Sequence, residues 1–104
     1  MATFAYYKIT TTDATTISAK EIGDPKSITL CNRDADGSDC TIDLLLDDFE
    51  GVQKVYILHD VVIPGGSTLV LEHPEILYDS IAYGLVVKLA SVSATQLLDV
   101  KVAY

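Results

Sequence analysis

Residues 81–89 read IAYGLVVKL and residues 98–104 read LDVKVAY, and these two stretches decide the fold class. Bulky apolar side chains occupy the odd-numbered positions of the first stretch and the even-numbered positions of the second. The charged residues Lys88, Asp99 and Lys101 fall on the opposite faces. A side-chain period of two is typical of a β-strand with one face on a core and the other in water. We therefore expect the chain to close with a pair of half-buried strands, the second of them part of the core.

The rest of the chain has the same preference for strands. Short segments rich in β-branched and aromatic residues alternate with breaks rich in Gly, Pro and Asp. Residues 52–63 carry apolar side chains on both faces, which predicts a bulge or burial on both sides. Before the closing pair, the expected strands are residues 3–10, 15–20, 27–32, 39–46, 52–63 and 67–71. About eight strands at this spacing, with no convincing helix, predict one all-β domain, an antiparallel β-sandwich or a small barrel.

Composition and charge narrow the range of functions. The chain has 104 residues, of which 49% are hydrophobic, so it is large enough for one core. Fifteen acidic and seven basic residues give a formal net charge of −8, which disfavours binding to nucleic-acid phosphates. The first residues lack the basic start and apolar run of a signal peptide, and no uncharged stretch is long enough to span a membrane. We expect a protein made in a cytoplasm, with neither nucleic acid nor membrane as a partner.

Residues 32–43 have the oxygen-ligand spacing of a calcium loop. The candidate ligands are Asn32, Asp34, Asp36, Asp39 and Asp43. Two features argue against calcium: both flanks look like strands instead of helices, and the closing residue is Asp instead of Glu. We favour a turn that joins residues 27–32 and 39–46 into a hairpin, with Asp and Gly supplying the turn chemistry. A calcium site is the alternative.

The same hairpin would place the two cysteines opposite each other. With the turn centred between residues 35 and 36, Cys31 faces Cys40 across the strand pair. Opposed residues in an antiparallel pair come close enough for a disulfide. Because thiols stay reduced in a cytoplasm, we favour free cysteines and keep the disulfide as the alternative. The spacing is not that of a redox-active Cys-x-x-Cys motif.

No pattern in the chain indicates catalysis. His59 and His73 are the only imidazoles, and neither has the neighbours of a zinc site or of a hydrolase triad. The acidic run at residues 47–50 crowds one loop instead of facing a second carboxylate across a cleft. We therefore expect no enzyme activity and no cofactor. Tyr6 and Tyr7 point to opposite faces of one strand, so one of them is expected to be exposed or to contact a partner.

Five stretches of the chain follow a recognisable layout: residues 26–32 (KSITLCN), 40–46 (CTIDLLL), 59–71 (HDVVIPGGSTLVL), 85–91 (LVVKLAS) and 98–104 (LDVKVAY). This layout resembles that of small virion proteins of tailed bacteriophages. In those proteins a short hairpin is followed by a long strand that ends in a Val-x-Ile-Pro-x-Gly-like corner, and two alternating strands finish the domain. The resemblance covers residues 26–104.

The resemblance implies an immunoglobulin-like or jelly-roll sandwich that acts as a capsid cement (decoration) protein. It implies no catalytic residues, localisation in a virion assembled in the host cytoplasm, and the major capsid protein or other virion proteins as partners. A homo-oligomer is expected, with a trimer favoured. Residues 1–12 are the candidate strand or arm for contacting a partner, and the candidate interface residues are Phe4, Tyr6, Tyr7 and Tyr104. The alternatives are a neck or tail component, or a β-sandwich that binds carbohydrate or protein and carries the calcium loop.

Overall fold

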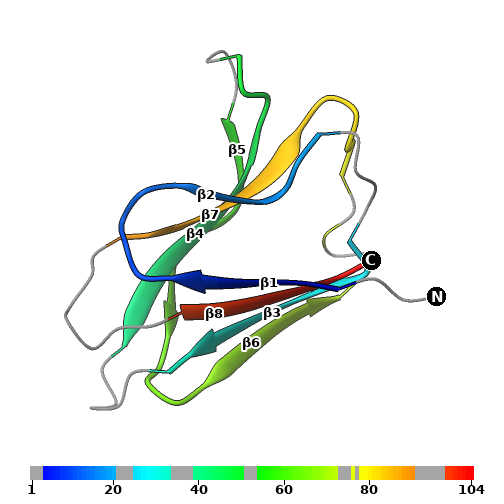
Figure 1. The fold of residues 1–104 in the computed structure, drawn as a ribbon. Helices are drawn as coiled ribbons and strands as arrows, with labels where there is room; N and C mark the ends of the chain where they lie inside the picture. The colour runs from blue at the N-terminus through cyan, green and yellow to red at the C-terminus, as the bar shows by residue number, and fades with distance from the viewer. Residues whose placement is uncertain are drawn as a thin grey trace.

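The structure, a computed structural model, describes residues 4–20, 25–33, 39–50, 54–72, 76, 78–90 and 98–104. Within these ranges the chain forms eight β-strands and no helix. The strands make two antiparallel sheets of four that pack against each other, which confirms the predicted all-β sandwich (Figure 1). No helix among the described residues is long and apolar enough to cross a lipid bilayer.

Each sheet draws its strands from distant parts of the sequence. The first, called sheet one, has the order β1 (Phe4–Ile9), β8 (Leu98–Ala103), β3 (Ser27–Asn32), β6 (Thr68–Glu72). The second, called sheet two, has the order β2 (Thr15–Ser18), β7 (Gly84–Leu89), β4 (Cys40–Asp47), β5 (Lys54–Ile63). These bounds lie within three residues of the predicted ones.

Two predicted strand pairs are wrong. β3 and β4 do not form a hairpin, because β3 pairs with β8 and β6 while β4 pairs with β5 and β7. β7 and β8 are likewise separated into different sheets. In both cases the strands face each other across the core instead of lying side by side. Alternation along a strand reveals which face is buried, but it does not reveal whether the next strand is a neighbour or lies opposite.

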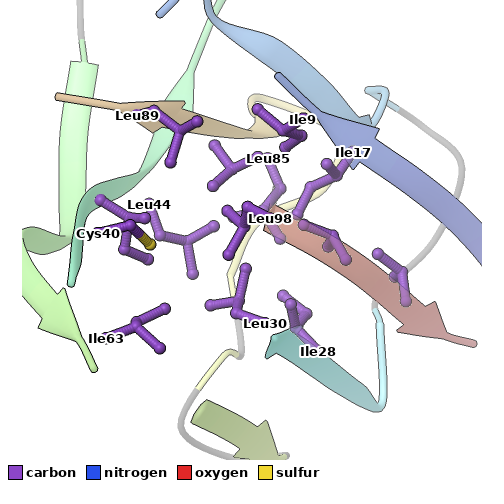
Figure 2. Packing of buried hydrophobic residues seen from close by; sticks show 14 of the residues in the cluster. Ile9, Ile17, Ile28, Leu30, Cys40, Leu44, Ile63, Leu85, Leu89 and Leu98 are labelled. Carbon is purple, nitrogen blue, oxygen red and sulfur yellow. The ribbon is translucent and has the colours of Figure 1, made fainter. Parts of the chain in front are cut away.

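The core is a layer of aliphatic side chains between the two sheets (Figure 2). From sheet one it receives the alternate residues of β3 and β8, including Leu30 and Val100, which are directly paired across the ladder. From sheet two it receives Leu44, Val87 and their neighbours along β4 and β7. β8 lies between β1 and β3, so it contributes hydrogen bonds on both sides as well as core side chains. The prediction that the closing strand belongs to the core is confirmed.

β5 contains the irregularity expected for residues 52–63. Its pairing with β4 shifts register on both sides of Leu44. At one of these shifts Asp60 adopts a positive φ of 53°, a conformation that is uncommon for residues other than glycine. The strand therefore bends where His59 and Asp60 together oppose the single residue Asp43.

The strand β7 is more deeply buried than its alternating pattern predicts. Val86 and its ladder partner Leu45 point away from the core, yet both are buried. At the start of β7 the ring of Phe49 lies against Gly84, at a point where any Cβ would collide with it. A side chain at position 84 would also come within 2.9 Å of the Ser18 carbonyl oxygen. Glycine is thus required here by close packing over the outer face of sheet two.

The central place of β8 gives a testable expectation. Leu98→Ala should lower the free energy of unfolding by about 2–5 kcal/mol, because Leu98 is buried and its truncation leaves a cavity in the core. The control Val70→Ala, at an exposed position of β6, should change it by less than about 0.5 kcal/mol. Urea denaturation followed by circular dichroism measures both. Equal effects of the two variants would contradict the core described above.

Candidate functional site

The outer face of sheet one is the surface on which exposed aromatic and charged side chains gather. Along β1, residues 5, 7 and 9 point into the core while Phe4, Tyr6 and Lys8 point outward, so Tyr6 and Tyr7 lie on opposite faces as predicted and Tyr6 is the exposed one. Tyr6 is 71% exposed and Phe4 is 45% exposed. The ladder places Tyr6 next to Lys101 of β8, and Lys101 next to Thr29 of β3. The sandwich thus presents rows of outward side chains that run across the strands.

An open groove of about 520 Å³ runs over this face. Its lining is Tyr6, Tyr7, Lys8, Thr29, Cys31, Asp99, Val100 and Lys101. The lining comes from β1, β8 and β3, three adjacent strands, so the floor is rigid hydrogen-bonded sheet. This groove has the size of a site for a small ligand or for part of a protein partner.

The groove has more positive than negative charge. Asp99 accepts a hydrogen bond from Arg33 at 3.0 Å and lies 3.5 Å from the Lys8 ammonium. The Lys101 ammonium lies 4.9 Å from the centre of the Phe4 ring, in cation–π contact. Two cations therefore contact the Asp99 carboxylate and a third, Lys101, lies over an aromatic ring on the same face, on a chain whose overall charge is −8.

A second cluster of functional groups lies at the bend of β5. Asp43 Oδ1 accepts the backbone N–H of Asp60 at 2.8 Å and lies 3.0 Å from His59 Nδ1. His59 Nε2 lies 3.4 Å from the Asp60 carboxylate, and the Tyr56 ring stands edge-on to the imidazole at 4.7 Å. The sequence showed no neighbours of a zinc site or of a hydrolase triad for His59, so this cluster was not predicted. The doubly apolar pattern of residues 52–63 was the available signal, because it indicated a bulge at this point.

The Asp43–His59–Asp60 cluster has donor atoms of the kind that bind metal ions. One atom from each residue lies within 4.8 Å of the others. However, each imidazole nitrogen already faces a carboxylate, and Asp43 also caps the backbone of the bend. The arrangement therefore satisfies the polar groups that the bulge leaves without ladder partners. Its chemistry is that of a structural anchor.

Those residues of the candidate calcium loop that the structure describes do not converge. Asn32 is buried between the sheets, where its side-chain amide donates to the Ile63 carbonyl at 2.9 Å. Asp43 points outward from sheet two, so the first and last proposed ligands lie on different faces of the sandwich. Asp39 is exposed just before β4. Asp34 and Asp36 lie outside the described residues, as does His73.

The cysteines are also placed differently from the hairpin expectation. Cys31 lies on β3, where it pairs with Thr68 and Asp99 and lines the groove. Cys40 is buried on β4, where it pairs with Ile63. Both are free thiols. Because the two strands belong to different sheets, the cross-strand arrangement on which the disulfide alternative depended is wrong.

The four candidate interface residues, one phenylalanine and three tyrosines, divide into an exposed pair and a partly buried pair. Phe4 and Tyr6 are exposed, whereas Tyr7 and Tyr104 pack against the core. The hydroxyls of Tyr7 and Tyr104 both donate to the carbonyl of Ile17, at 3.2 and 3.3 Å. Burial, together with the neighbouring Tyr104 hydroxyl, raises the pKa of Tyr7 above its usual value. Residues 4–9 form β1, an edge strand of sheet one that pairs with β8, and not a free arm. Residues 1–3 lie outside the described residues.

Comparison with known proteins leaves the function open. Neither a scan against models of protein families nor a search of curated proteins finds a match to this chain. The resemblance to virion proteins therefore stays a prediction from the residues.

The anchor at the β5 bend can be tested by removing its carboxylate. Asp43→Ala should lower the free energy of unfolding by about 1–3 kcal/mol, because the Asp60 amide loses its acceptor. Asp43→Asn keeps an acceptor oxygen and should therefore lower the free energy of unfolding by less than Asp43→Ala does. Asp13→Ala, at an exposed position outside the cluster, should stay within about 0.5 kcal/mol of the parent protein. Urea titration distinguishes the three, and an Ala variant as stable as the parent would contradict the assignment.

We expect the stabilising contribution of the Tyr7 hydroxyl to be lost at alkaline pH. Because its pKa is raised in the folded protein, its contribution is fully present below the unfolded pKa of about 10 and is lost as pH rises through the folded value. At neutral pH Tyr7→Phe should cost about 0.5–1.5 kcal/mol through the lost hydrogen bond. The gap between variant and parent should shrink above about pH 10. Thermal melts across pH measure this, with Tyr6→Phe as the control that changes little.

Proposed function

We propose that this protein is a structural component of a tailed-bacteriophage virion, a capsid cement protein that stabilises the shell through protein–protein contacts. The proposal starts from the resemblance of residues 26–104 to small virion proteins, and the β-sandwich is consistent with it. The observation that carries it is the outer face of sheet one, where Tyr6 projects from a rigid sheet with 71% of its surface exposed and Phe4, under the Lys101 ammonium, is still 45% exposed. Exposed aromatic side chains of this kind are typical anchors of protein interfaces.

Adhesion of this kind needs no catalytic group. Full burial of one aromatic side chain against a partner contributes about 1.5–3 kcal/mol. The binding free energy of one copy is then modest. A shell with many equivalent sites, however, becomes more stable with every copy that binds. A neck or tail component of the virion would bind its neighbours through the same face, so the mode of adhesion is the same at either location.

A carbohydrate-binding module is a second candidate, and one observation favours it. In the groove the exposed Tyr6 ring stands beside Thr29, Asp99 and Lys101, so an apolar platform lies next to hydrogen-bonding groups. Small-molecule sites combine apolar walls with a few placed polar groups in this way. A glycan array would separate the two: saturable binding of a sugar that is lost in Tyr6→Ala favours the module.

The cement function is tested with empty shells assembled from the major capsid protein encoded in the same genome. The chain should co-sediment with the shells to a fixed stoichiometry and raise their melting temperature. Tyr6→Ala should weaken binding by about thirtyfold, the effect of losing an interface anchor worth about 2 kcal/mol. Val62→Ala, which truncates an exposed apolar residue on sheet two, is the matched control. Shells that bind no wild-type protein, and melt unchanged, would refute the proposal.

A further inference from the structure

Charge is unevenly distributed over the described surface. Three of the seven cations of the chain, Lys8, Arg33 and Lys101, surround the groove on sheet one. The one carboxylate among them, Asp99, is already paired with Lys8 and Arg33. The groove therefore has an excess of about two positive charges, counted from these four groups, on a molecule with a net charge of −8.

The opposite charge is concentrated where β4 leads toward β5. Asp47, Asp48 and Glu50 follow one another around Phe49, in what we call the acidic turn (residues 47–50). In Figure 1 the chain that leaves β4 projects away from sheet one, so the acidic turn and the groove lie on different sides of the molecule.

The acidic turn has a fixed shape. The Asp47 carboxylate accepts the backbone N–H of Phe49 at 2.8 Å, and the Asp48 carboxylate accepts that of Glu50 at 2.9 Å. Phe49 adopts a positive φ of 60°, and one side of its ring lies against Gly84. Even so, 48% of Phe49 is exposed. An aromatic side chain flanked by carboxylates is therefore presented in a prearranged form, which lowers the entropy cost of binding.

We propose that the groove on sheet one binds the acidic turn of a second copy of this chain. The exposed part of Phe49 packs beside Tyr6 on the floor of the groove, and Glu50 pairs with Lys101 at its rim. The groove volume of about 520 Å³ is ample for one aromatic ring with its flanking carboxylates. The charges are complementary at the contact although the molecules repel overall. At physiological ionic strength the distant charges are screened beyond about 8 Å, while contacting pairs are not.

Such a contact joins two different surfaces, so it is head-to-tail. Each copy that offers its acidic turn keeps a vacant groove for the next one. Contacts of this type close into rings where the rotation allows and otherwise extend as chains. The inference deepens the proposed function and rests on it for its biological setting, since it supplies the contact between neighbouring copies on a shell. It concerns the pure chain, however, and is measured without any shell.

The test is a charge exchange between two variants. Sedimentation equilibrium in 0.15 M salt (the physiological ionic strength) should show association of the wild type that increases with concentration. Lys101→Glu and Glu50→Lys should each weaken it by about tenfold or more. An equimolar mixture of the two should associate again, because the intact groove of the Glu50→Lys chain meets the intact acidic turn of the Lys101→Glu chain. Lys88→Glu and Asp13→Lys make the same charge changes at exposed positions elsewhere and should behave as the wild type.

A native cysteine supplies an independent readout. Cys31 lines the groove whereas Cys40 is buried, so alkylation of Cys31 should slow as the wild-type concentration rises and Cys40 serves as the internal reference. Circular dichroism melts establish that each variant is folded. A wild type that stays monomeric at high concentration, or a mixture that associates no better than either variant alone, would overturn the contact. Shell binding in the same preparations would then leave the cement function standing.

Discussion

The aliphatic layer between the two sheets is the interaction on which the rest of the molecule depends. It is built from strands that alternate strictly, so every second residue of β3 and β8 enters the layer and the residues between them remain outside. Because inward positions such as Leu30, Val100 and Leu44 are fixed by packing, the outward positions are fixed too. The relative placement of Tyr6, Lys101 and Thr29 on the outer face follows from this register. The surface chemistry is thus a product of the core.

A second constraint ties the sheets together near their edges. The carbonyl oxygen of Ile17 on β2 accepts hydrogen bonds from the hydroxyls of both Tyr7 and Tyr104. Tyr7 lies on β1 of sheet one, and Tyr104 directly follows β8 of the same sheet. The two aromatic side chains therefore bridge the open side of the sandwich between β1 and β2. This role explains why they are half-buried while Phe4 and Tyr6, on the other face of β1, are exposed. One strand in this way separates structural aromatic residues from those available to a partner.

Much of this architecture could be read from residue alternation, and the remainder could not, for a physical reason. The two opposite faces of β1 and the core role of β8 follow from a period of two, which is a local property. The partners of β3 and β4 depend on pairing between residues far apart in the sequence, and nothing local distinguishes a hairpin from a crossover between sheets. The groove depends on that pairing, because it joins β1, β8 and β3. The same holds for Asp43 and His59, which meet only because β5 bends beside β4.

The bend of β5 has a consequence for how crowded copies behave. β5 is the longest strand and forms an edge of its sheet, so its unpaired backbone groups would otherwise be a template for strand addition by a neighbour. The left-handed backbone at Asp60 and the charged groups beside it interrupt that edge midway. Natural β-sheet proteins use such interruptions to prevent amyloid-like stacking. Copies that meet at this edge therefore find a poor template for adding a strand, and β5 stays part of its own folded unit.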